Sequence, residues 1–205
     1  MNAMKLKLHL NLRPVGARHA MKKFFSFAWE ILKIVIIALV IVVPIRYFLF
    51  QPFFVKGQSM EPTFENGDYL IIDEISYQFR NPQRGEVIVF KYPNDVSQRY
   101  IKRIIGLPGE TIEIKEGKVI IYNQLGEQIL EEAEYLNSSV YTPGDVRVTL
   151  GEEEYFVLGD NRAASLDSRR WGPLFEDYIL GQVFLRAWPF TTLAKVESPE
   201  YPNNY

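Results

Sequence analysis

The sequence predicts a mostly β fold, in which one N-terminal transmembrane helix precedes an antiparallel β-sheet domain. Two observations carry this prediction. An uncharged apolar run begins at Ile34 and reads IVIIALVIVVPI, and with its flanks it approaches the roughly 20 residues that a membrane-spanning helix needs. After this run, short apolar stretches are separated by turn signals about every eight to twelve residues, which is typical of all-β domains.

The segment before the apolar run is basic. The first 29 residues hold six Lys or Arg and no Asp or Glu, which by the positive-inside bias predicts a cytoplasmic N-terminus. We therefore expect a cytoplasmic segment at 1–30, an anchor helix at 31–50 and an extracytoplasmic domain at 51–192. No small-x-small cleavage pattern follows the run, so we expect it to stay attached rather than be removed as a signal peptide. A buried core helix is the alternative interpretation.

Seven apolar stretches of the domain read as strands, each bounded by Gly, Pro, Asn or Asp. They are DYLIID, EVIVFKY, YIKRIIG, TIEIK, KVIIYN, YFVLGD and ILGQVFLRAW. The alternation in TIEIKEGKVIIY predicts a hairpin around EGK. Residues 124–153 are more acidic and less periodic, which indicates an insertion with its own short strands. Residues 193–205 read as a polar tail, and we expect its end, SPEYPNNY, to fray.

Charge and cysteine content exclude several classes of function. After Arg46 the chain carries 24 acidic and 15 basic residues, and this acidic balance argues against a nucleic-acid partner. The sequence contains no cysteine, which excludes disulfides, thiol nucleophiles and thiolate metal sites.

A lone serine, Ser59, stands in the turn-forming stretch GQSMEPTFENGDYLIID. A serine hydroxyl becomes a useful nucleophile when a neighbouring group accepts its proton, and histidine is the usual acceptor. The two histidines, His9 and His19, precede the anchor and would lie across the membrane from Ser59. A Ser-His-Asp triad and a histidine-bound zinc are therefore excluded by position, which leaves a lysine, a carboxylate, or no catalysis.

A lysine base must be desolvated, because at its reference pKa only ~0.04% of the side chain is neutral at pH 7. In YIKRIIG the strand alternation puts Tyr100, Lys102 and Ile104 on one face. Lys91 at the end of VIVFK has similar neighbours and is the competing candidate. The alternative is that both are edge-strand lysines that hinder aggregation.

Three separated stretches together resemble the type I signal peptidases, which are membrane-anchored serine proteases with a Ser/Lys dyad. The stretches are RYFLFQPFFVKGQSMEPTFENGDYLIID, RGEVIVFKYP followed by YIKRIIGLPGE, and GDNRAASLDSRRWGPL. The resemblance implies that Ser59 is the nucleophile. Alignment through KRIIGLPG implies that Lys102, and not Lys91, is the general base. It also implies that Ser165 hydrogen-bonds the lysine amine.

Further residues follow from the same resemblance. Those expected to shape the site are Asp160, Asn161, Arg162, Asp167 and Arg169. Those expected to line shallow substrate pockets, each of which is also a candidate for ordinary core packing, are Phe53, Val55, Met60, Tyr100 and Ile101. One position departs from the pattern. Some members use a serine two residues before the nucleophile as an oxyanion donor, and here that residue is Gly57, so the second donor must be another backbone amide or water.

The function implied by the resemblance is removal of signal peptides from exported preproteins after sites of the Ala-x-Ala type. We expect a monomer in the cell (plasma or inner) membrane whose partners are signal peptides and the lipid bilayer, with no nucleic acid, metal or organic cofactor. Two rival hypotheses remain. One is a self-cleaving Ser/Lys peptidase related to repressors, which would need a helix-turn-helix domain; the other is a non-catalytic, membrane-tethered β domain that binds partners.

Overall fold

The computed structural model describes residues 15–44, 50–137, 140–199 and 201, and the side chains of 15–20, 44 and 50 lie outside this description. The chain divides into two units, Met1–Ile45 and Arg46–Tyr205, which are considered separately below.

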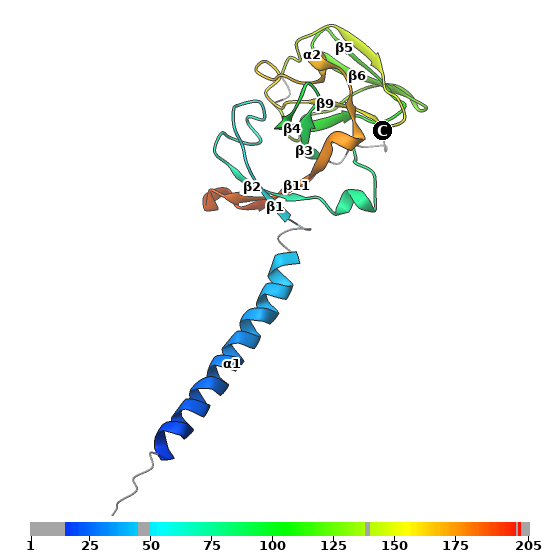
Figure 1. The fold of residues 1–205 in the computed structure, drawn as a ribbon. Helices are drawn as coiled ribbons and strands as arrows, with labels where there is room; N and C mark the ends of the chain where they lie inside the picture. Colours follow the sequence, from blue (N-terminus) through cyan, green and yellow to red (C-terminus); the bar gives the residue numbers. More distant parts are fainter. Residues whose placement is uncertain (1–14, 45–49, 138–139, 200, 202–205) are drawn as a thin grey trace, which may run out of the picture. The chain divides into compact units, whose positions relative to one another are not determined.

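The described part of the first unit is one long helix, α1, at Val15–Pro44 (Figure 1). By length and composition, its 23-residue stretch Met21–Val43, with a mean hydropathy of 2.5, can cross a membrane. The helix differs from the predicted bounds of 31–50, because it is already helical at Val15 and because residue 50 belongs to β1. The early start agrees with the sequence, since between Val15 and residue 31 the chain contains no proline and, after Gly16, no glycine. Residues 45–49 lie outside the described residues.

The second unit is built on an eight-stranded antiparallel sheet (Figure 1). Its strands are β1 Phe50–Phe54, β2 Tyr69–Asp73, β3 Val87–Tyr92, β4 Asp95–Gly106, β9 Glu154–Leu158, β10 Leu174–Phe175, β11 Ile179–Trp188 and β12 Ala194–Lys195. The order is β1-β2-β11-β3-β4-β9-β10, and β12 pairs with β11. Because β11 pairs with both β2 and β3, it joins the serine segment and the lysine segment in one sheet.

A second, four-stranded sheet follows β4 in the chain. Its strands are β5 Thr111–Lys115, β6 Lys118–Asn123, β7 Gly126–Ile129 and β8 Val146–Thr149, in the order β7-β6-β5-β8. The hairpin around EGK is confirmed, with positive φ at Glu116 and Gly117. The insertion predicted at 124–153 therefore begins too late, since β8 pairs with β5 and draws the hairpin into the same sheet.

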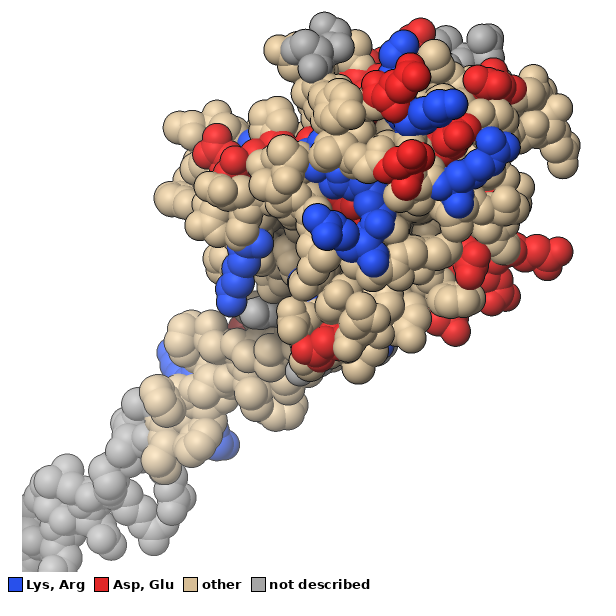
Figure 2. Space-filling view, turned by 90° about the horizontal axis from the view of Figure 1, so that it is seen from above, with Lys and Arg blue, Asp and Glu red and all other residues tan. Residues whose placement is uncertain are grey.

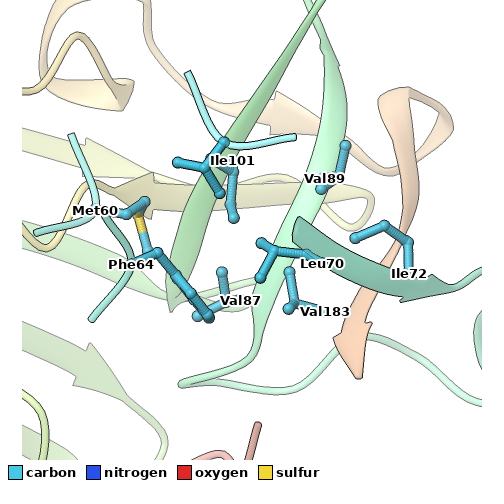
Figure 3. Close-up of a cluster of buried hydrophobic side chains, with 9 residues drawn as sticks. Met60, Phe64, Leu70, Ile72, Val87, Val89, Ile101 and Val183 are labelled. Atoms are coloured by element: carbon cyan, nitrogen blue, oxygen red, sulfur yellow. The ribbon is translucent and has the colours of Figure 1, made fainter. Parts of the chain in front are cut away.

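Buried hydrophobic clusters pack against both faces of the large sheet. This explains why the β3 sequence VIVF is apolar at every position. Val87 and Val89 pack in one buried cluster, whereas the alternate residues Ile88 and Phe90 pack in another. Strand side chains alternate between faces, so a strand that is buried on both sides needs apolar residues throughout. The first cluster holds Met60 (Figure 3), which follows Ser59 directly.

Short helices and the C-terminal segment complete the unit. They are α2 Ser168–Trp171 and the 3-10 turns η2 Ser76–Gln78, η3 Glu176–Tyr178 and η4 Phe190–Thr192. The prediction that the end of the chain, SPEYPNNY, frays is wrong for its described residues Pro199 and Tyr201. Val196 packs against the first cluster and Tyr201 against the cluster beside the second sheet. A Cβ atom on Gly85 would lie 2.8 Å from Pro199. These apolar side chains hold an otherwise polar segment against the domain.

Candidate active site

Ser59 lies in the turn region between β1 and β2, and three of its neighbours fix this turn. Gly57 adopts φ +91°, a conformation that favours glycine, and its N–H donates to Asn66 Oδ1 at 2.9 Å. Met60 and Phe64 are 0% and 1% exposed and anchor the turn in the core (Figure 3). The serine hydroxyl is therefore held on a rigid support at a partly exposed position.

Lys102 reaches this serine from β4. Its side chain is buried, and Nζ donates to Ser59 Oγ at 2.6 Å and to the carbonyl of Ile101 at 2.8 Å. The Tyr100 ring centroid lies 5.6 Å from Nζ, and Tyr100 and Ile104 pack in the same cluster, so the predicted face of β4 is confirmed. Lys91 is exposed at the end of β3 and has no contact with Ser59.

Burial lowers the pKa of Lys102 from 10.5 to about 8, while the carboxylates of Asp167 and Asp160 oppose this shift by favouring the charged ammonium. Desolvation wins because the amine is removed from water and no carboxylate contacts it directly. At a pKa of about 8, roughly one amine in ten is neutral at pH 7, which is about two hundred times the fraction for an exposed lysine. The site therefore supplies a free amine within hydrogen-bond distance of a hydroxyl.

A buried ion pair stands beside the lysine. Arg103, whose side chain points to the opposite face of β4 from Lys102, donates to Asp160 through Nε at 2.9 Å and Nη2 at 2.6 Å. Asp160 also accepts from Thr63 Oγ1 at 2.5 Å, and Arg103 donates to the Gly85 carbonyl. Thr63 belongs to the serine turn, so these contacts join the first, second and third sequence motifs.

The loop after β9 packs directly against the backbone of Ser59. The Asn161 N–H donates to the Ser59 carbonyl at 3.1 Å, and a Cβ on Gly159 would lie 2.4 Å from the same oxygen. Only a glycine permits this approach. The Gly159 N–H donates to Asp167 Oδ2 at 3.0 Å, which fixes the loop from its other side.

Arg162 and Asp167 hold the loop through further buried contacts. Arg162, 2% exposed, donates to the Gly159 carbonyl and to both carboxylate oxygens of Glu132. Asp167 caps α2 by accepting from the Arg169 N–H, and it pairs with the Arg169 guanidinium at 2.8 Å. Asp160, Asn161, Arg162, Asp167 and Arg169 thus lie in one connected network behind the Ser59–Lys102 pair.

Ser165 lies close to Gly159, which also approaches the Ser59 carbonyl. The structure nevertheless shows no hydrogen bond between the described side chains of Ser165 and Lys102. The Ser165 Oγ is buried without a hydrogen-bond partner, and it would lie 2.2 Å from a Cβ on Gly159. The bond between Ser165 and the lysine amine stays a prediction.

A cleft of about 890 Å³ opens over the pair. It is lined by Pro52, Phe53, Phe54, Lys56, Gly57, Gln58, Ser59, Ser97, Gln98, Arg99, Tyr100, Ile101, Lys102, Ala164 and Leu166. Phe53, Tyr100 and Ile101 are among the lining residues, and their contact with substrate stays a prediction. Val55 and Met60 do not line this cleft and are buried at 3% and 0% exposure.

A metal ion has no evident site in the part of the chain that the structure describes. No group of three or more His, Asp or Glu side chains is arranged to hold one there. His9 lies outside the described residues, as does the side chain of His19.

Sequence reasoning missed Thr63, Arg103, Glu132 and Gly159. Arg103 follows Lys102 directly and Gly159 precedes Asp160 directly. Their adjacency to predicted site residues could have identified them from the sequence. Glu132 lies in the acidic stretch 124–153, and nothing in its local pattern sets it apart from Glu131 or Glu134.

The chain matches a family model described as "Signal peptidase, peptidase S26" over residues 28–188. It is 37% identical to a probable signal peptidase I-2 of Synechocystis sp., covering 78% of this chain and 73% of that protein. It is 35% identical to a signal peptidase I of Leptolyngbya laminosa, covering 91% and 92%. A crystal structure of a signal peptidase I from Enterococcus faecalis aligns with 51% of this chain and 97% of its own, at 32% identity and a TM-score of 0.42.

Proposed function

The chain belongs to the signal peptidase family, peptidase S26, and from this membership we propose that Ser59 is its nucleophile and Lys102 its general base. The protein is a serine peptidase that cleaves signal peptides. The observation that carries the assignment of residues is the 2.6 Å contact between Lys102 Nζ and Ser59 Oγ, made by an amine whose pKa burial lowers to about 8. This depression provides the free base that a serine nucleophile requires.

The reaction is acyl transfer in two steps. With the amine neutral, the Ser59 hydroxyl donates its proton to Nζ as Oγ attacks the scissile carbonyl, and the resulting ammonium protonates the departing amine. The neutral lysine then takes a proton from water as the water oxygen attacks the acyl-enzyme, and the ammonium returns that proton to Oγ as the acyl group leaves, which restores Ser59 and the neutral amine. The Ile101 carbonyl, 2.8 Å from Nζ, accepts one N–H of the amine and leaves its lone pair free to accept the proton from Oγ.

The oxyanion that forms during attack needs hydrogen-bond donors. Among the described residues, the Ser59 N–H donates to no hydrogen bond, and it belongs to the same residue as the attacking oxygen, so we propose it as one donor. The Gly57 N–H already donates to Asn66 Oδ1. The second donor therefore comes from a different amide or from water, as expected for a chain with glycine at position 57.

The substrate enters the cleft as an extended strand between the segment 53–58 and β4 residues 98–102, both of which line it. Small side chains at the first and third positions before the cut point inward, toward walls that include Phe53, Tyr100 and Ile101. Such a site cleaves after Ala-x-Ala sequences of exported preproteins.

Membrane attachment follows from α1, whose stretch Met21–Val43 can span a bilayer. We infer a single-pass monomer with its basic N-terminus in the cytoplasm and residues 46–205 outside, where exported preproteins emerge. Lipid contact by the second unit is supported by its exposed aromatic side chains at Trp188 and Phe190.

A preprotein assay tests the assignment of the two residues. Detergent-solubilised full-length enzyme is mixed with a preprotein whose signal ends in Ala-x-Ala, and the product termini are read by mass spectrometry. Ser59→Ala, Lys102→Ala and Lys102→Arg should each abolish cleavage, the last because a guanidinium does not give up a proton near neutral pH. Lys91→Ala is the matched control and should keep full activity. Cleavage by the Lys102→Arg protein at the wild-type rate would exclude Lys102 as the base.

A further inference from the structure

The catalytic cleft differs in charge from the domain that contains it. Its lining includes three cations, Lys56, Arg99 and Lys102, and no carboxylate. The chain after Arg46 nevertheless holds 24 acidic and 15 basic residues, and both signs are interspersed on the face shown in Figure 2. A cationic cleft in an acidic domain therefore needs an explanation beyond overall composition.

Lys102 is accounted for by catalysis, but Lys56 and Arg99 are not. Both are exposed, and they stand on different walls of the cleft, one in the segment after β1 and the other on β4. Neither forms an ion pair with any residue that the structure describes. Their charges are therefore available to a bound peptide.

The register of β4 adds to this positive potential. Arg99 stands directly opposite Lys91 on β3, and like charges at such a position are destabilising. Glu74 offsets part of this charge through its electrostatic interaction with Arg99, but the two form no ion pair among the described residues. Asp95 accepts hydrogen bonds from Ser97 and Gln98.

We propose that Lys56 and Arg99 select peptides with an acidic side chain near the cut, first of all at the residue between the two small ones of the Ala-x-Ala site. This inference rests on the proposed function of the cleft. In an extended peptide, alternate side chains point in opposite directions. If the small residues face the pockets, the residue between them faces the mouth of the cleft, where the two exposed cations lie.

The energy of exposed ion pairs indicates a modest but measurable preference for an acidic residue in the peptide. A single exposed ion pair changes an affinity by roughly 1.4- to 5-fold, and a cleft with low-dielectric walls focuses the field of its charges. Replacing Lys by Glu in the peptide exchanges repulsion for attraction at both cations. We expect kcat/KM for a Glu peptide to exceed that for a Lys peptide by about three- to tenfold at low ionic strength.

The experiment uses full-length enzyme in neutral detergent and three synthetic signal peptides that differ only at the central residue of Ala-Xaa-Ala, where Xaa is Glu, Gln or Lys. The expected order of kcat/KM is Glu, then Gln, then Lys, and the spread should shrink as added salt shortens the Debye length from about 30 Å at 0.01 M to about 8 Å at 0.15 M. In a second peptide series, Glu, Gln or Lys is placed two residues before Xaa, at a position that faces the same way in an extended strand. This series measures how far along the peptide the charge preference extends.

Charge-reversal variants identify the residues responsible. Lys56→Glu and Arg99→Glu should each weaken the preference, and the double variant should reverse it to favour Lys. Lys115→Glu is the matched control, since Lys115 is exposed on β5, outside the cleft lining, and changes the net charge equally. The control should keep the wild-type order. Both cleft positions are at the surface, so the substitutions leave the core intact.

The outcomes separate this inference from the proposed function. If no peptide is cleaved by the wild-type enzyme, the proposed function itself fails. If the Gln peptide is cleaved but Glu, Gln and Lys peptides are processed equally, the function stands and the charge selection is excluded. A preference that persists unchanged in the double variant would also overturn the role of Lys56 and Arg99.

Discussion

A single buried amine sets the chemistry of this site at the residue scale. Lys102 is 3% exposed, and Asp160 and Asp167 lie near enough to raise its pKa but do not contact it. Desolvation therefore outweighs attraction, and the pKa falls to about 8. A carboxylate in direct contact would favour the ammonium and remove the free base, so the arginines that pair with Asp160 and Asp167 also protect the function of the lysine.

The buried lysine should cost stability, and Lys102→Met should recover it. A pKa below the unfolded value means that the unfolded chain binds the proton more tightly. The penalty is therefore complete below pH 8, fades between about pH 8 and pH 10.5, and is absent above. The difference between 10.5 and about 8 corresponds to about 3 kcal/mol. Thermal unfolding of Ser59→Ala enzyme with and without Lys102→Met, at pH 6 and pH 11, measures it.

The expected result is a higher melting temperature for the Lys102→Met protein at pH 6 and a much smaller difference at pH 11. Lys91→Met is the control, and because Lys91 is exposed it should change little at either pH. An equal gain at both pH values would mean that packing, and not the desolvated charge, causes the effect.

Single residues were predictable to different degrees. The β alternation around Lys102 placed its aromatic and aliphatic neighbours correctly, because a strand has a fixed period of two. Val55 and Met60 were expected at pockets but are buried in the core, since sequence cannot tell which way an apolar residue in an irregular turn points. The absence of a hydrogen bond from Ser165 to the amine depends on side-chain torsions that no sequence pattern specifies.

At the scale of elements, the second sheet supports the catalytic loop. Glu132, between β7 and β8, accepts from both terminal nitrogens of the buried Arg162, and Thr142 accepts from Arg162 Nη1 at 2.7 Å. Arg162 in turn donates to the Gly159 carbonyl, next to the backbone of Ser59. The Tyr135 ring lies 3.9 Å from the Arg103 guanidinium. The insertion thus contacts both arginines that hold the GDNR stretch.

Glu132→Gln should loosen this support. It leaves a buried guanidinium with a neutral partner, which we expect to lower the free energy of unfolding by about 1–3 kcal/mol. Displacement of the loop should lower kcat about tenfold while KM changes little, because the cleft walls stay in place. Steady-state cleavage of a signal peptide provides both constants.

Glu131→Gln removes the same charge from the adjacent exposed residue and should leave kcat unchanged. A Glu132→Gln enzyme with wild-type kcat and a lowered melting temperature would reduce the second sheet to a purely structural role.

The positions of individual strands were predicted better than the pairing between strands. The strand ILGQVFLRAW matches β11, Ile179–Trp188, because a long apolar run bounded by turns is a strong local signal. An insertion with its own short strands was predicted from residue 124, whereas the second sheet already includes the hairpin that begins at Thr111. Which sheet a hairpin joins depends on long-range pairing with β8. The packed tail was missed for the same reason, since its apolar residues are few and contact distant strands.

At the scale of the whole molecule, the chain comprises a long apolar helix and a β domain. The helix contributes no side chain to the dyad, which lies entirely within the second unit. Its proposed role is to keep the enzyme at the membrane where signal peptides emerge, with the basic N-terminus inside. This orientation rests on charge distribution and can be measured independently of activity.

Single cysteines can report the orientation, because the natural chain has none. Ala17→Cys provides a thiol before the stretch Met21–Val43, and Lys118→Cys provides one at an exposed position on β6. In intact spheroplasts, a membrane-impermeant maleimide should label the Lys118→Cys protein only, and both should be labelled after permeabilisation. Labelling of the Ala17→Cys protein alone in intact spheroplasts would reverse the proposed orientation.

The central claim is that Lys102 is neutral often enough to act as a base, and its own titration tests this most directly. The folded enzyme is prepared with 13C at the lysine Cε, and Lys102 is assigned from the signal that disappears in the Lys102→Met protein. We predict a midpoint near pH 8, as for the pKa of about 8 that burial gives this side chain. A midpoint near 10.5 would show an ordinary, charged lysine and would contradict the Ser59–Lys102 dyad.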